Sequence, residues 1–169
     1  MKICLYLFCL FLGACTNMPK AIQNMNVVDI TYSQASQNIE SHRNVPVRWG
    51  GIIIDVENEE DFSLIQVLSY PLNFSGRPQL DDSHGGRFVI KSTEFLDPVV
   101  YAKDKEISVV GKLDGDIQRT VGKKIIQVPL IQSMGIHLWP KQQNNHYGFG
   151  PHHYYYSYPF FRGGFYYPY

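Results

Sequence analysis

The sequence lacks several features that would indicate nucleic-acid binding, metal binding or common catalytic chemistry. Its 15 Lys and Arg residues balance its 15 Asp and Glu residues, so no excess of positive charge favours a nucleic-acid partner. It contains no phosphate-binding Gly-rich loop, no Gly-x-Ser-x-Gly motif and, after residue 15, no pair of cysteines for a zinc site. We therefore expect a protein without enzymatic activity, without a cofactor and without a nucleic-acid partner.

The sequence also has little continuous hydrophobicity. Its N-terminal apolar run, Ile3–Leu12, would extend only about 15 Å as a helix, roughly half the thickness of a bilayer core. Such a run directly after Lys2 is typical of the core of a signal peptide, not of a membrane-spanning helix. Residues 1–14 are therefore predicted to be a signal peptide.

Cysteine is absent after residue 15. The three cysteines are Cys4, Cys9 and Cys15, so cleavage before Cys15 would leave one cysteine and exclude an internal disulfide. The block Leu12-Gly13-Ala14-Cys15 resembles the lipobox of bacterial lipoproteins, in which two small residues precede the cysteine that is lipidated. The alternative is an ordinary signal peptide that happens to hold a cysteine. We predict that Cys15 carries a diacylglyceryl group and an amide-linked acyl chain, because two or more chains anchor stably.

Residues 15–29 are polar and show no sustained apolar period, so they are expected to form a tether between the lipid and a folded domain. The domain is predicted over residues 30–140, a size sufficient for one core. Thr31 is expected to cap a short helix over Tyr32–Glu40.

The remainder of the domain has the pattern of short strands separated by Gly, Pro, Asn and Asp turns. Strands are predicted at Val47–Glu57, Phe62–Tyr70, Arg87–Lys91, Glu106–Leu113 and Lys124–Ile131, with Gly135–Trp139 as a closing strand. The adjacent Gly50 and Gly51 are expected to mark a bulge or sharp bend, and Asp114-Gly115 a turn. Five or six such strands predict an all-β fold, a small OB-like Greek-key barrel.

The composition changes at residue 141. Residues 141–169 contain eight of the twelve Tyr and four of the ten Phe, but no Ile, Leu or Val. Aromatic residues broken by Gly and Pro cannot form a close-packed core alone, so this segment is predicted to be a disordered, low-complexity tail. Its rings could contact the membrane interface, a neighbouring envelope protein or another copy of the tail.

The domain resembles the Slp family of outer-membrane lipoproteins. The resemblance covers residues 30–140 and the lipobox, and the tail lies outside it. The residues that carry it are Trp49, Gly50, Gly51, Pro71, Gly76, Arg77, Pro78, Gly86, Arg87, Phe95, Asp97, Pro98, Gly111 and Trp139. They lie in six short blocks, which are residues 47–51, 70–78, 86–88, 95–101, 109–113 and 137–140. No single block is specific, but six blocks in family order are hard to obtain by chance.

The resemblance implies an envelope lipoprotein associated with starvation or stationary phase and without an assigned chemical activity. Residue 16 is Thr where an inner-membrane retention signal would have Asp, so lipoprotein analogy implies the outer membrane of a Gram-negative bacterium. We expect the domain to face the periplasm and to act as a non-enzymatic binding or scaffolding module. The alternative is a periplasmic binder of a glycan or small ligand, or a hydrolase accessory, that uses the barrel face.

Candidate reactive residues are few. Asp97 lies between apolar residues and could serve acid–base chemistry, but an aspartate before proline more often forms a turn. His84 and His137 have no nucleophile motif to serve. Trp49 and Trp139 could stack on a sugar or base, although core or rim positions are commoner. Three histidines of the tail, His146, His152 and His153, are candidate ligands of a weak metal site.

Overall fold

Five β-strands follow a short N-terminal helical region in the computed structural model of the chain, which describes residues 18–23 and 26–141. The helical elements are α2 (Lys20–Gln23), α3 (Tyr32–Gln37) and the 3-10 helix η1 (Glu40–His42). The strands are β1 (Pro46–Asn58), β2 (Ser63–Tyr70), β3 (Gly86–Ser92), β4 (Glu106–Val121) and β5 (Lys124–Leu138). The expected signal peptide (residues 1–14), Cys15 and residues 142–169 lie outside the described residues.

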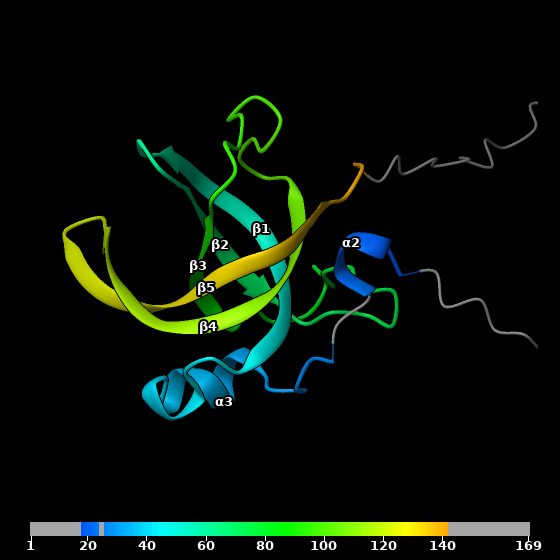
Figure 1. Cartoon of the computed structure of the whole chain (residues 1–169), viewed down its shortest axis with the longest axis horizontal. Helices are drawn as coiled ribbons and strands as arrows, with labels where there is room; N and C mark the ends of the chain where they lie inside the picture. The colour runs from blue at the N-terminus through cyan, green and yellow to red at the C-terminus, as the bar shows by residue number, and fades with distance from the viewer. Residues whose placement is uncertain (1–17, 24–25, 142–169) are drawn as a thin grey trace, which may run out of the picture.

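The strands form a closed barrel in the order β1-β2-β3-β5-β4, with β4 paired back to β1 (Figure 1). All neighbouring pairs are antiparallel except β3 and β5, which are parallel. This order and this single parallel pair are those of a five-stranded OB-type Greek-key barrel. The all-β, OB-like prediction is therefore confirmed, and the described residues contain five strands and not six.

The barrel core is filled from the inward-facing positions of all five strands. Trp49 is 5% exposed, and its ring packs against Tyr32 and Phe88 with centroid distances of 5.7 and 5.5 Å. Its Nε1–H donates to the carbonyl of Ile30 at 2.7 Å, which satisfies the one polar group of the ring. Trp49 is thus a core residue and not an exposed stacking platform.

The short helix begins as the sequence predicts and ends earlier. Thr31 caps α3 through a capping box with Gln34, and Ala35 is fully buried in the core cluster. The α-helix ends at Gln37 and a separate 3-10 turn covers Glu40–His42, where the prediction had one helix to Glu40.

The predicted tether is wrong for its described part. Residues 20–23 form α2, and Ile22 is fully buried. Arg48 holds this segment, since its Nε–H donates to the carbonyl of Ile22 at 2.8 Å. The backbone of Val28 also donates to the carbonyl of Pro46 at 2.8 Å. A single buried isoleucine among polar residues has no periodicity, so the sequence pattern gave no sign of this packing.

Three predictions about turns, strands and bulges also need correction. Asp114-Gly115 is a register irregularity inside β4, with Gly115 at φ +75°, and the chain turns at Gly122 instead. The predicted strands Lys124–Ile131 and Gly135–Trp139 are one continuous strand, β5. The pairing of β1 with both neighbours is regular at Gly50 and Gly51, and its irregularity lies between Ile53 and Asp55.

Gly50 and Gly51 allow β1 to lie close to its neighbours β2 and β4. An added Cβ on Gly51 would collide with the backbone carbonyl of Leu68 in β2, and one on Gly50 would lie 2.7 Å from the carbonyl of Ile107 in β4. Gly111 in β4 has the same relation to Gln132 in β5. These glycines let the strands approach where the barrel closes.

Candidate functional site

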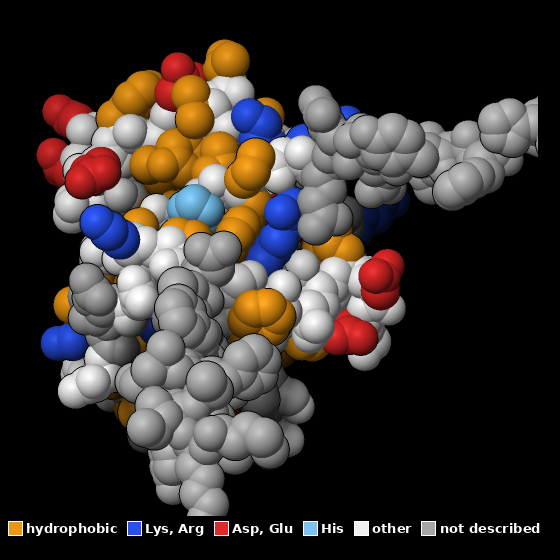
Figure 2. Space-filling model, turned by 90° about the vertical axis from the view of Figure 1, so that its right-hand side faces the viewer, with side chains coloured by type: hydrophobic (Ala, Val, Ile, Leu, Met, Phe, Trp, Pro, Cys, Tyr) orange, Lys and Arg blue, Asp and Glu red, His pale blue; other side chains and the backbone are white. Residues whose placement is uncertain are grey.

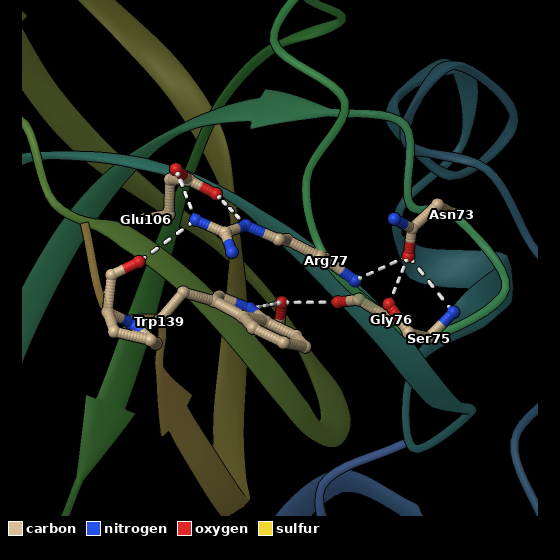
Figure 3. Close-up of polar contacts among 8 residues, drawn as sticks. Asn73, Ser75, Gly76, Arg77, Glu106 and Trp139 are labelled. Atoms are coloured by element: carbon tan, nitrogen blue, oxygen red, sulfur yellow. Dashed lines mark hydrogen bonds and ion pairs between the residues drawn. The ribbon is translucent and has the colours of Figure 1, made fainter. Parts of the chain in front are cut away.

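The loop of residues 71–79, between β2 and β3, is built around one asparagine. The Asn73 side-chain oxygen accepts hydrogen bonds from the backbone N–H groups of Ser75 and Arg77, each at 3.0 Å, and from the Ser75 hydroxyl at 2.7 Å (Figure 3). An isolated β-bridge between Leu72 and Pro78 closes the loop. Asn73 thereby fixes the conformation that presents Arg77, although no motif in the sequence marks Asn73.

Arg77 joins this loop to the first residue of β4. Its Nε–H and Nη2–H donate to the two carboxylate oxygens of Glu106 at 2.6 and 2.9 Å, and both side chains are about 15% exposed. Nη2 also donates to the carbonyl of Pro140 at 3.0 Å, and the guanidinium lies 5.4 Å from the centre of the Trp139 ring. Arg77 therefore holds the end of the barrel to the 71–79 loop (Figure 3).

Ser108 makes a second connection in the same place. Its hydroxyl donates to the carbonyl of Gly76 at 2.6 Å and accepts from Trp139 Nε1–H at 2.9 Å. Gly76 has φ +83°, a backbone conformation that a residue with a Cβ rarely adopts. Trp139 is accordingly a rim residue with its polar group satisfied. Glu106 and Ser108 were not predicted as site residues, because no local sequence signal identifies a partner that is distant in the chain.

The charges of this cluster affect its titratable groups. The hydrogen bonds to Glu106 raise the pKa of Arg77, against an opposing effect of burial. His137 packs edge-to-face on Trp139 with a centroid distance of 4.5 Å. Burial lowers the pKa of His137, and the charge of Arg77 lowers it further. His137 is therefore kept neutral at pH 7 as a packing residue.

A cleft of about 350 Å³ opens between residues 29–33, the start of β1 and the end of β2. Aromatic side chains of Tyr32 and Tyr70 line it together with Arg48 and Asp29. Burial raises the pKa of Tyr32, so its hydroxyl remains protonated. A mainly apolar cleft with a few polar groups is the usual form of a small-ligand site.

A second cleft, of about 340 Å³, shares Asp29, Arg48 and Leu72 with the first. Phe74 and Met18 form part of its other wall. Burial lowers the pKa of Arg48, and no carboxylate among the described residues lies within 4.0 Å of its guanidinium. The two clefts thus meet at a partly buried cation.

The remaining motif residues have structural contacts. The Asp97 carboxylate accepts from the backbone of Val99 at 2.8 Å, and its carbonyl accepts from Val100 and Tyr101, so Asp97 begins a turn that runs through Pro98. Gly86 has φ +145° and lies against the Tyr32 ring, beside Arg87. His84, in the loop before β3, packs edge-to-face on Tyr70 at the end of β2. Pro71 lines the first cleft, and Phe95 is 73% exposed.

The predicted lipid-attachment residue Cys15 and the tail histidines His146, His152 and His153 lie outside the described residues. Within the described ranges, no three His, Cys, Asp or Glu residues form a group that could hold a metal ion. Likewise, no helix in residues 18–23 and 26–141 is long and apolar enough to cross a membrane.

The fold defines a class of protein: a single OB-type barrel with an N-terminal segment packed on it. The 71–79 loop is held to this barrel by the bonds between Arg77 and Glu106. The sequence comparison gives the family. The chain belongs to the Outer membrane lipoprotein Slp family, whose family model matches residues 12–169. It is thus an outer-membrane lipoprotein by family, and the resemblance seen in the sequence is confirmed. The match extends through the tail, which the resemblance had placed outside the pattern.

Relatives in two Gram-negative bacteria support this assignment. The chain is 26% identical over 130 residues to Outer membrane protein Slp of Escherichia coli K12. The matched region covers 76% of this chain and 69% of that protein. It is 25% identical over 135 residues to the uncharacterized lipoprotein YeaY of the same strain, covering 78% and 68%. An uncharacterized protein of Haemophilus influenzae is 27% identical over 133 residues, covering 78% and 72%.

Among solved structures, the chain is similar to a small single-stranded DNA-binding protein from Streptomyces coelicolor. The TM-score is 0.36 and the identity 10%, with 56% of this chain and 94% of that chain covered. At this score the likeness supports no conclusion about the ligand.

Proposed function

We propose that this lipoprotein is anchored through acylated Cys15, faces the periplasm and acts without catalysis as a binding or scaffolding module under starvation or stress. The observation that supports the absence of catalysis is that the hydrogen bonds of Arg77 are made within the protein itself. Both of its carboxylate contacts are made to Glu106 and its remaining bond to a backbone carbonyl, so the motif's arginine is engaged in holding the barrel end. The Asp97 carboxylate is engaged in a turn in the same way.

The proposed scaffolding role depends on residues 141–169. This segment begins directly after Pro140, whose carbonyl accepts a hydrogen bond from Arg77. A pull-down from solubilised envelopes, with the full chain and with a chain ending at Pro140, tests this role. The full chain is expected to retain an envelope partner that the shortened chain loses, while the melting temperature stays nearly unchanged. If the shortened chain unfolds, the aromatic residues cover the barrel and the scaffolding role is wrong.

A second candidate function is binding of a glycan or another small ligand in the first cleft. The observation that favours it is the pair of tyrosine side chains, Tyr32 and Tyr70, in a mainly apolar cleft of about 350 Å³. Aromatic faces of this kind stack on sugar rings. Titration calorimetry with soluble peptidoglycan fragments should then show binding that Tyr70→Ala weakens about tenfold or more. The matched control Ile125→Ala changes an exposed side chain on β5, outside the cleft, and should leave binding unchanged.

The starvation association has a separate test. The amount of the protein per cell should rise severalfold between exponential growth and stationary phase, as measured by immunoblot. A constant amount would contradict this part of the proposal.

A further inference from the structure

The two described ends of the chain meet at the 71–79 loop. Met18 and Ile22 pack on Gly76, since their side-chain carbons lie 3.6 and 2.9 Å from where a Cβ of Gly76 would be. The other end is held there as well, because Arg77 binds the carbonyl of Pro140. Figure 1 shows α2 and the end of β5 on the same side of the barrel, opposite the tip of the β4–β5 hairpin.

The distance from this loop to the anchor is limited by chain length. Three residue steps separate Cys15 from Met18, and each step spans at most about 3.8 Å, so the two Cα atoms are at most about 11 Å apart. The headgroup layer of one leaflet is itself roughly 5–8 Å thick. If Cys15 carries acyl chains, as proposed above, the surface around Met18 must lie in or next to the headgroup layer.

The side chains on that surface are suited to a lipid interface. Phe74, in the same loop, is 84% exposed, the largest exposed fraction among the large hydrophobic residues of the described part of the chain. Val28 is 48% exposed and lines the second cleft with Phe74 and Met18. Figure 2 looks onto the side of the molecule on which α2 and the end of β5 lie, and both hydrophobic and Lys or Arg side chains are exposed on it. Aromatic rings favour the headgroup level of a bilayer.

The second cleft adds a charge at the same level. Arg48 lines it without a carboxylate within 4.0 Å among the described residues, although Asp29 lines the same cleft. Two of its donors, Nε–H and Nη2–H, are already bound to the carbonyls of Ile22 and Gln23. The remaining donors of the guanidinium can bind an oxygen of a lipid phosphate.

We propose that the 71–79 loop, with Met18 and Val28, docks on the leaflet that holds the acyl chains of Cys15, and that the Phe74 ring enters the headgroup region. This inference rests on the proposed anchor at Cys15 and adds an orientation to it. The barrel is held close to the membrane with the β4–β5 hairpin pointing away, and residues 141–169 begin at the membrane surface.

The test places a single fluorescent label on the acylated full-length protein in vesicles of phosphatidylethanolamine and phosphatidylglycerol. Cys4 and Cys9 precede the predicted cleavage site and the Cys15 thiol would be acylated, so an introduced cysteine is the one that reacts. Phe74→Cys is the probe. The matched control is Ile125→Cys, because Ile125 is 69% exposed and lies directly after the β4–β5 turn, on the opposite side of the barrel.

An environment-sensitive dye at position 74 should shift its emission to the blue on vesicle binding and be quenched severalfold by headgroup-labelled lipids. The dye at position 125 should remain in water. Equal, water-like signals at both positions on vesicle-bound protein would overturn the docking proposal and leave the anchor intact. Failure of the protein to float with the vesicles would overturn the anchor, and the docking proposal with it.

Discussion

Replacing Arg77 by Met tests how strongly the 71–79 loop holds the barrel end. Methionine keeps the length and apolar stem of the side chain but removes the paired bonds to Glu106, the bond to Pro140 and the contact with the Trp139 ring. The Glu106 carboxylate is then left about 15% exposed without its cation. The free energy of unfolding should therefore fall by more than a surface ion pair contributes.

The expected magnitude lies between two known limits. An exposed pair contributes about 0–1 kcal/mol, whereas removing one partner of a fully buried pair costs about 3–5 kcal/mol. Side chains that are about 15% exposed are nearer the second limit, and solvent screening reduces the cost. We expect a loss of about 2–3 kcal/mol, of which the ring contact supplies about 0.5–1. For a domain of this size that is a fall in Tm of roughly 8–12 °C.

The assay is urea unfolding followed by tryptophan fluorescence, on Arg77→Met, on Glu106→Gln and on the double variant. Because each single change removes the same pair, the double variant should be about 1–2 kcal/mol more stable than the sum of the single losses predicts. Arg77→Lys should recover part of the stability, since it keeps the charge but not the paired geometry. Additive effects, or a loss below about 0.5 kcal/mol for Arg77→Met, would refute this reasoning.

Three further predictions concern other parts of the domain. Gly51→Ala should cost about 3 kcal/mol or more in urea unfolding, because the added Cβ meets the Leu68 backbone, whereas Gly122→Ala meets nothing within 4 Å and should cost about 1 kcal/mol of backbone strain; equal losses would contradict the close-approach argument. Ile22→Ala should cost about 2 kcal/mol, since Ile22 is fully buried, and an unchanged stability would mean that the segment is a free tether after all. The lowered pKa of His137 means that the unfolded chain binds its proton first. The contribution of His137 to stability should therefore be present above about pH 6.5 and be lost as the pH falls through its folded-state pKa, and His137→Gln should flatten this dependence in Tm measurements between about pH 7.5 and 5; an identical pH profile would show that another group is responsible.

The sequence was sufficient for the barrel because each strand carries its own pattern. Ile65 and Ile90 face the main core cluster and Leu64 and Val89 face a second buried cluster, so these strands are apolar on both faces. The caps and turns around them are local signals. The prediction of a turn at Asp114-Gly115 was wrong because it relied on such a local signal. Asp-Gly fits a hairpin turn and a bulge equally well, and the continued pairing of β4 with β5 from Asp116 to Val121 decides for the bulge.

The candidate site was predicted only in part. Arg77, Gly76 and Trp139 were found through the family pattern, but Glu106, 29 residues from Arg77 in the chain, was not. The clefts depend on where the segment of residues 26–33 lies on the barrel, and a few contacts distant in sequence settle that. Only the fold brings such groups together.

The central claim is that this chain is anchored in the outer membrane through Cys15. Intact-mass spectrometry of the protein extracted from outer membranes tests it most directly. The account predicts one species that begins at Cys15 and carries the added mass of a diacylglyceryl group and an amide-linked acyl chain. A species that retains Cys4 and Cys9, or that begins elsewhere with a free Cys15 thiol, would contradict it.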